Sequence, residues 1–315
     1  MKKLLSLTIL LGCLLCPLNT AYSAEKKTFN LNLFKNKSEK TKTTESTTKE
    51  KSSFSSIYSV AKFFNEYEYV ANNYNHNAYL GCYSDDYLSA DGFNLVILSG
   101  VVKDTWKTYP GIKYKVKLNG VTFYKNMAIA DVTETAKGYT RTDEENVGEF
   151  VCTMQSIYYL KQNGKSWLIT GDYTTKENMI LQWGDAKKSK IDLEAPTQMQ
   201  AGKEYSAILT VKQPDGVIAI GSITADKITY PQKPSKEIYR KFSSEGTIER
   251  IMKTNTEQTN EYIVGTVGFT RPKLDEDQNL DIKLTGYACI MERMNIIPVN
   301  NFIEVKNDNQ PEQQK

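Results

Sequence analysis

Two stretches in the first half of the chain carry apolar residues at helical spacing. The first obeys the i, i+3, i+4, i+7 rule, which predicts a helix with one apolar stripe, through Ile57, Val60, Ala61, Phe64, Tyr67, Ala71 and Tyr74. The second predicts a helix over residues 93–109 that Pro110-Gly111 ends, with a stripe of Leu95, Leu98, Val102, Thr105 and Tyr109.

The period of the apolar residues then changes to two, which predicts strands with one solvent-exposed face. Apolar side chains alternate with lysines over residues 112–118, and further strands are expected at 127–139, 150–161 and 167–173. Asn163-Gly164 predicts a hairpin between the last two strands. A turn is expected at Lys125-Asn126 and a bulge at Asn119-Gly120, because this choice gives strands of even length.

The second half of the chain contains short strand-like runs separated by turn residues. A polar run over residues 184–190 predicts a domain boundary near it. Short strands with regular turns indicate an all-β sandwich over 191–305, from the runs 204–212, 217–223, 247–254, 261–270 and 280–293. Residues 54–184 and residues 191–305 each have the length of a domain of ordinary size, so we expect two domains.

The N-terminus has the layout of a secretory signal. Lys2 and Lys3 precede an uncharged, largely apolar run over residues 4–15, which is too short to cross a bilayer as a helix. Small residues in Ala21-Tyr22-Ser23 predict cleavage after residue 23. Leu10-Leu11-Gly12-Cys13 offers an alternative, because it resembles the bacterial lipobox in which the cysteine, here Cys13, is lipidated. We therefore expect a periplasmic or extracellular protein, or a membrane-anchored lipoprotein.

Composition predicts disorder on both sides of the folded part. Residues 24–53 are rich in Lys, Thr, Ser and Glu and bury too little apolar surface to offset the entropy of ordering, and the tail at 306–315 is also polar. The chain has 40 basic and 37 acidic residues, so it lacks the charge expected of a nucleic-acid-binding protein.

Residues that could bind metals, phosphates or cofactors are sparse. Cys82, Cys152 and Cys289 are far apart without a CxxC pair, and His76 is the only histidine, so we expect no metal site. Both a Cys82–Cys152 disulfide and three buried free thiols remain open. No glycine-rich phosphate loop follows a strand, so we expect no cofactor.

The region from Ile57 to Asn178 resembles the NTF2-like, or SnoaL-like, family. The resemblance is carried by the long aromatic helix ending near Tyr79, the segment Tyr83-Ser84-Asp85-Asp86-Tyr87, the helix closed by Tyr109-Pro110-Gly111, the strand around Met127-Ala128-Ile129-Ala130, and Gly164-Lys165-Ser166-Trp167-Leu168-Ile169. It implies an α+β fold in which a curved antiparallel sheet forms a cone around the long helix, with an apolar pocket at the open end. Residues 191–305 look like an immunoglobulin-like sandwich, although the Cys…Trp…Cys pattern is absent.

Enzymes of this family mostly use an Asp or His base beside a Tyr or Asp donor. Asp131 would be a candidate base if it faced the cone, but strand alternation predicts that it points outward with Thr133 and Thr135. Asp85-Asp86 is better explained as a turn. No catalytic residue of the family can be carried over to this chain.

Tyrosine is the most abundant chemistry-bearing residue of the first half. We expect Tyr67, Tyr74, Tyr87 and Trp106 to line a ligand pocket in the cone; alternatively, these side chains fill the cone as core. We therefore predict an exported, non-catalytic module that binds an envelope protein or a small apolar ligand. The alternatives are an isomerase or dehydratase acting on a small apolar substrate, and a structural component of a surface complex.

Overall fold

The computed structural model describes residues 57–141, 147–274, 280–281 and 283–299. The predictions for residues 1–23, 24–53 and 306–315 and for lipidation at Cys13 lie outside these residues and stay predictions. Within the described ranges, none of the helices combines the length and the apolar character needed to cross a membrane.

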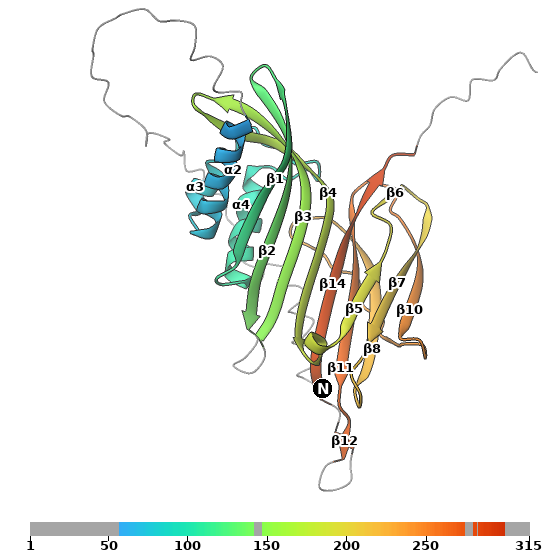
Figure 1. Ribbon diagram of the computed structural model, residues 1–315. Coiled ribbons are helices and arrows are strands. Elements are labelled where there is room, and N and C mark those ends of the chain that lie inside the picture. The colour runs from blue at the N-terminus through green and yellow to red at the C-terminus, as the bar shows by residue number, and fades with distance from the viewer. Residues whose placement is uncertain (1–56, 142–146, 275–279, 282, 300–315) are drawn as a thin grey trace, which may run out of the picture.

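The α-helices of the described chain lie together beside the first strands (Figure 1): α2 (Ile57–Asn72), α3 (His76–Leu80) and α4 (Leu95–Thr108). Both predicted helices are confirmed. α2 buries most of its predicted stripe, including Val60, Phe64 and Tyr67, although Ile57 at its start is 64% exposed. The long helix does not continue to Tyr79: α2 ends before Tyr74, whose φ of 55° is left-handed, and α3 is a separate helix. α4 begins after Asn94, whose side-chain oxygen accepts hydrogen bonds from the backbone N–H groups of its first turn.

Four long strands follow as an antiparallel meander: β1 (Lys113–Tyr124), β2 (Met127–Arg141), β3 (Val147–Asn163) and β4 (Ser166–Gly184). The turn at Lys125 and the hairpin at Gly164 lie where the sequence predicts them, with φ values of 52° and 59°. The predicted bulge is confirmed by the register shift between Leu118 and Gly120. β4 continues well beyond its predicted end at residue 173, because no chain-breaking residue occurs before Gly184.

The extension of β4 joins the two halves of the chain into one sheet. Residues 178–184 of β4 pair with β14 (Leu284–Ile297), and the sheet then continues through β11 (Glu261–Thr270), β8 (Ile218–Lys227) and β9 (Arg240–Lys241). β6 (Gln198–Gln200) adds in parallel beside the end of β14, which completes a nine-stranded sheet. Figure 1 shows β14 lying directly beside β4.

The predicted fold class is therefore wrong. The described chain is mostly antiparallel β, built on one large sheet, and is neither an α+β cone around a long helix nor a cone with a separate sandwich. The predicted boundary coincides with the 3-10 turn η2 (Asp185–Lys188), where the chain leaves the sheet, yet the hydrogen-bond ladder continues from β4 into β14. Periodicity could not reveal this pairing because it joins residues more than 100 positions apart.

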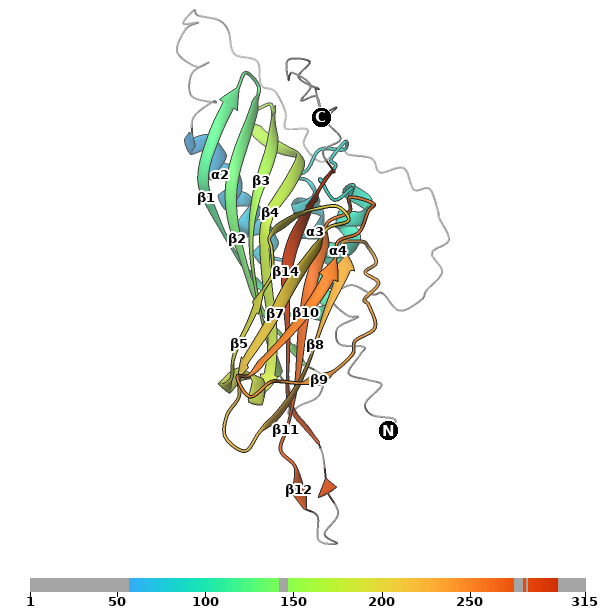
Figure 2. The same cartoon turned by 90° about the vertical axis from the view of Figure 1, so that its right-hand side faces the viewer.

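A smaller sheet of three strands packs against the second half of the large one, with the order β10 (Thr247–Lys253), β7 (Glu204–Lys212), β5 (Lys190–Glu194). Figure 2 looks onto this smaller sheet. Their shared core includes Leu209 and Ile248 from the small sheet and Ile263, Phe269 and Ile290 from the large one. A short hairpin of β12 (Lys273–Leu274) and β13 (Leu280–Asp281) extends beyond the layers.

β14 is covered on both faces. Ala288 and Ile290 face the small sheet, whereas Cys289 and Met291 belong to a second core together with Tyr109, just after α4. Burial on both faces explains why this strand is apolar without alternation. The helices and the small sheet thus lie on opposite sides of one continuous sheet.

Candidate functional site

The residues predicted to line a pocket come together in the structure. Tyr74 contacts Trp106 with ring centroids 5.6 Å apart, and Trp106 contacts Tyr79 at 6.0 Å. Tyr79 contacts Tyr67 at 5.1 Å. The fourth predicted residue, Tyr87, joins through Tyr83, at 4.8 Å. We call this set the aromatic cluster: Tyr67, Tyr74, Tyr79, Tyr83, Tyr87 and Trp106.

Three hydroxyls at the centre of the cluster bond to one another. Tyr67 and Tyr79 hydroxyls are 2.7 Å apart, Tyr67 and Tyr83 are 3.0 Å apart, and Tyr79 and Tyr83 are 3.1 Å apart. Each hydroxyl can both donate and accept, so the three form a closed ring. Burial raises the pKa of all three tyrosines, which keeps the hydroxyls protonated.

A buried carboxyl lies on the sheet side of this cluster. Glu134 of β2 accepts a hydrogen bond from the Tyr158 hydroxyl of β3, and Tyr158 packs against Tyr67 at 6.5 Å. Burial raises the pKa of the Glu134 carboxyl to about 7; the hydrogen bond from Tyr158 opposes the rise, and the nearby carboxyls of Asp172 and Glu177 add to it. Glu134 can therefore exchange a proton near neutral pH.

Sequence reasoning considered the wrong acid of β2. Asp131 points away from the cluster, as its alternation predicts, and accepts a hydrogen bond from the Asn119 amide at 3.1 Å. Ala130, Val132 and Glu134 share the buried face of the strand. The same period of two therefore placed Glu134 inward, and this was the available signal for it.

Two more carboxyls, both on β4, accept hydrogen bonds from tyrosines. The Tyr87 hydroxyl donates to Asp172 at 2.6 Å, and the Tyr262 hydroxyl donates to Glu177 at 2.9 Å. Burial raises the pKa of both carboxyls. A line of protonatable acids thus crosses the buried face of the sheet.

Arg293 neutralises part of this charge at the seam between the two halves. Its side chain is 2% exposed, and its Nη1 and Nη2 donate to both oxygens of Asp91 at 2.9 and 2.6 Å. Glu177 lies 4.0 Å from the same guanidinium. Asn260 also donates to Asp91, at 2.8 Å. The pairing fixes the loop before α4 onto β14.

The histidine and the cysteines, which were considered as metal ligands, have other roles in the structure. His76 bonds Ser99 of α4 through Nε2, at 3.1 Å from the hydroxyl. Cys82, Cys152 and Cys289 are free thiols. Within the residues that the structure describes, no group of three or more His, Cys, Asp or Glu side chains could hold a metal ion.

The outer members of the aromatic cluster are also hydrogen-bonded within the protein. The Tyr74 hydroxyl donates to the Ile112 carbonyl at 2.6 Å, and the Trp106 indole donates to the Tyr114 hydroxyl at 3.1 Å. These polar groups therefore have partners within the protein. The partners lie at and just before β1, so the cluster connects the helical region to the sheet. The arrangement favours the core interpretation of these four predicted residues.

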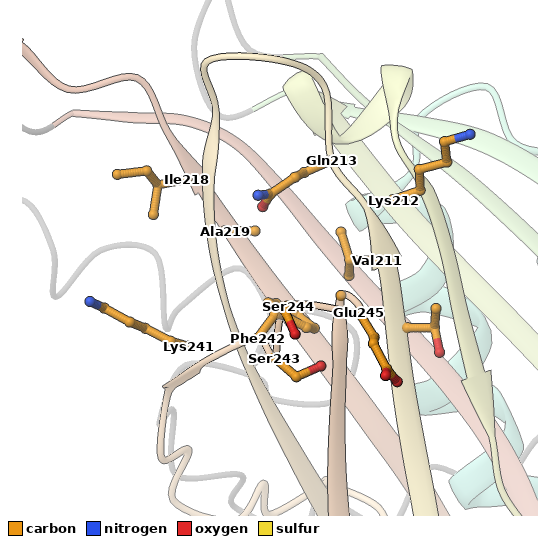
Figure 3. Close-up of a pocket in the computed structure, with 12 residues that line it drawn as sticks. Val211, Lys212, Gln213, Ile218, Ala219, Lys241, Phe242, Ser243, Ser244 and Glu245 are labelled. Carbon is orange, nitrogen blue, oxygen red and sulfur yellow. The ribbon is translucent and has the colours of Figure 1, made fainter.

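An open groove lies instead at one end of the two packed sheets (Figure 3). Its volume is about 550 Å³, and it lies between the end of β7, the start of β8 and the turn that leads into β10. Val211, Ala219 and Phe242 give it apolar surface, and Gln213, Ser243 and Glu245 give it polar groups. Sequence reasoning missed this groove because the walls come from three separate segments.

Similarity to known proteins is confined to part of the chain. No protein-family model matches it, and no curated protein is similar to it in sequence. Bd1075 of Bdellovibrio bacteriovorus matches with 15% identity over 36% of this chain and 38% of that chain, at a TM-score of 0.29. A conserved protein of Planctomyces limnophilus matches with 11% identity over 36% of this chain and 91% of its own, at a TM-score of 0.32.

ActVI-ORFA of Streptomyces coelicolor matches with 11% identity over 38% of this chain and 92% of its own, at a TM-score of 0.28. Structures of this set are cone-type proteins of the SnoaL-like and NTF2-like group. At these scores the likeness assigns no activity to this chain, and the immunoglobulin-like resemblance stays a prediction.

Proposed function

We propose that this chain is an exported bacterial envelope protein that acts as a non-catalytic binding module. The observation that carries the proposal is the contrast between the aromatic cluster, whose polar groups all have hydrogen-bond partners within the protein, and the open groove beside Phe242. A volume of about 550 Å³ falls in the range of pockets that take a small ligand or the side chains of a partner.

The side chains around the groove suit a protein partner or a small apolar ligand. Ile218, which lines the groove, is 47% exposed, and Ile220 on the same strand is 39% exposed. Exposed aliphatic side chains beside an apolar floor and a polar rim are typical of interaction sites.

Site-specific photo-crosslinking tests this proposal. A benzophenone side chain at Ser244, on the groove wall, should give a discrete crosslinked partner in the cell envelope. The same group at Thr153, exposed on β3, should not. Ile218→Asp should abolish the crosslink, whereas Ile57→Asp, at an exposed position on α2, should leave it unchanged. Equal crosslinking at Ser244 and Thr153 would contradict the proposal.

A second candidate function is supported by one observation, the buried pair of Glu134 and Tyr158. A carboxyl with a pKa of about 7 beside a tyrosine hydroxyl can act as a general acid–base pair on a small apolar carbonyl compound. Exchange of α-hydrogens of small ketones in D₂O, followed by NMR, tests it. Acceleration by the wild type that Glu134→Gln removes would support an enzyme, and equal rates would exclude this one.

A further inference from the structure

Among the strands that the structure describes, β10 pairs with β7 alone, so it is an edge strand of the small sheet. Thr254, just past its end, directs its N–H to Lys203 beside β7. Thr247 and Glu249 direct their carbonyls the other way, to the Ser243 N–H at 3.0 Å and the Arg240 guanidinium at 3.2 Å. Because backbone groups alternate along an antiparallel strand, Ile251 presents its N–H and C=O on this outer edge.

A cationic pocket of about 250 Å³ adjoins this edge, between β10 and β8. Lys236, Arg250 and Lys253 line it, and no acidic side chain does. Arg250 is held in place by donating Nη1 to the Ile223 carbonyl, and a guanidinium carries five N–H donors, so further donors remain. The pocket is therefore suited to a carboxylate.

Acidic side chains near the pocket already have partners. Asp226 accepts the backbone N–H of Ser235 at 2.5 Å, and Glu237 accepts the Tyr239 hydroxyl at 2.7 Å. Among the described residues, no carboxylate pairs with Lys236, Arg250 or Lys253 within 4.0 Å, so the charge of these three lining residues remains available to a ligand. Aliphatic surface lies beside it, because Ile251 is 72% exposed and Ile238 is 61% exposed.

The β1 edge of the large sheet, by contrast, is protected. On β1, the N–H of Tyr114 donates to the Asn72 side chain at 2.8 Å, and the N–H of Val116 donates to the Glu68 carboxyl at 2.7 Å. α2 supplies both acceptors, so this edge offers fewer backbone groups for pairing. β10 has no helix beside Ile251 in the described part of the chain, and an uncovered edge is a template for another strand.

We propose that the outer edge of β10 binds an extended acidic peptide segment of a partner protein. The segment adds as a further strand beside residues 251–253, and a carboxylate side chain enters the pocket of Lys236, Arg250 and Lys253. An apolar side chain of the segment packs on Ile251. Main-chain hydrogen bonds supply affinity and the pocket supplies the preference for acid. This inference rests on the proposed role as a binding module but uses a surface separate from the groove at Phe242.

Fluorescence anisotropy with a labelled octapeptide of alternating Glu and Val tests the proposal. The peptide should bind the protein, and binding should weaken with added salt. A peptide with Lys in place of Glu should bind at least about tenfold more weakly, because its charge is repelled by the pocket. A Glu/Val peptide that is N-methylated along one edge should weaken by a similar factor, because it cannot form the backbone hydrogen bonds of a strand pair. Equal binding of the Lys peptide would overturn the charge assignment, and equal binding of the N-methylated peptide would overturn strand addition.

Matched variants locate the site. The double variant Lys236→Glu/Lys253→Glu should lose about tenfold or more in affinity, because both side chains are exposed and line the pocket. Lys115→Glu/Lys117→Glu, the same charge change on exposed residues of β1, should have no effect. Unchanged affinity in the first variant would overturn the inference. If affinity were unchanged but the crosslink at Ser244 persisted, the proposed function as a binding module would stand without the peptide site at β10.

Discussion

Tyr158 donates its hydroxyl proton to the carboxyl of Glu134 across neighbouring strands of the sheet, in a position that solvent barely reaches. This contact joins the aromatic cluster to the row of buried acids formed with Asp172 and Glu177. The buried face of β2 to β4 therefore combines tight aromatic packing with one carboxyl, Glu134, whose pKa is about 7, and two others, Asp172 and Glu177, whose pKa values are raised by burial.

Stability should fall as pH rises because of Glu134. Its folded-state pKa of about 7 lies above the ordinary glutamate value of roughly 4.3, so its contribution is fully present below about pH 4 and is lost as pH rises through 7. The loss is on the order of 3 kcal/mol. The free energy of unfolding, measured in urea at pH 5 and at pH 8, should decrease less between these pH values for Glu134→Gln than for the wild type.

Glu194→Gln is the control for this measurement, because Glu194 is an exposed carboxyl on β5. It should follow the wild type at both pH values. A Glu134→Gln protein with an unchanged pH dependence would show that Glu134 does not titrate in this range.

Tyr67 and Tyr69 lie two residues apart on α2 but should respond very differently to truncation. Tyr67 is 3% exposed and Tyr69 is 70% exposed. Tyr67→Ala should cost about 3–5 kcal/mol of unfolding free energy through the cavity and the broken hydroxyl ring. Tyr69→Ala should cost no more than about 0.5 kcal/mol. Similar costs for the two variants, measured in urea, would argue against the aromatic cluster as a packed core.

Removing Arg293 should destabilise the seam between the two halves. Arg293→Met leaves the partly buried carboxylate of Asp91, 14% exposed, without its guanidinium partner, which should cost about 2–4 kcal/mol at pH 7. The double variant Asp91→Asn/Arg293→Met should recover much of that loss, because it removes the uncompensated charge. A double-mutant cycle from urea unfolding measures the coupling. Strictly additive costs would mean that the pair does not interact energetically.

Export should yield a mature chain that begins at Ala24, because Ala21-Tyr22-Ser23 carries small residues at the cleavage positions. Intact-mass spectrometry of the protein from the envelope fraction measures this. A mass corresponding to a chain that starts at a diacylated Cys13 would instead establish the lipoprotein route.

Local sequence patterns predicted α2, α4 and the strands β1 to β4 of the first half, but neither α3 nor the part of β4 after residue 173. The stripe through Phe64 and Tyr67 predicts α2, and short turns with left-handed residues such as Gly164 predict the hairpins. These features depend on residues a few positions apart, so their period and turn chemistry are visible in one segment. The aromatic set of Tyr67, Tyr74, Tyr87 and Trp106 was also predicted as a group.

The tertiary structure alone decided how the halves combine and which groups face one another. β4 pairs with β14 across more than 100 residues, and Arg293 reaches Asp91 across 202 residues. The groove and the cationic pocket likewise take their walls from separate strands. Periodicity states which face of a strand is buried but not which distant strand lies beside it. Backbone hydrogen bonds are the same for every sequence, so the choice of partner strand follows only from packing of the whole chain.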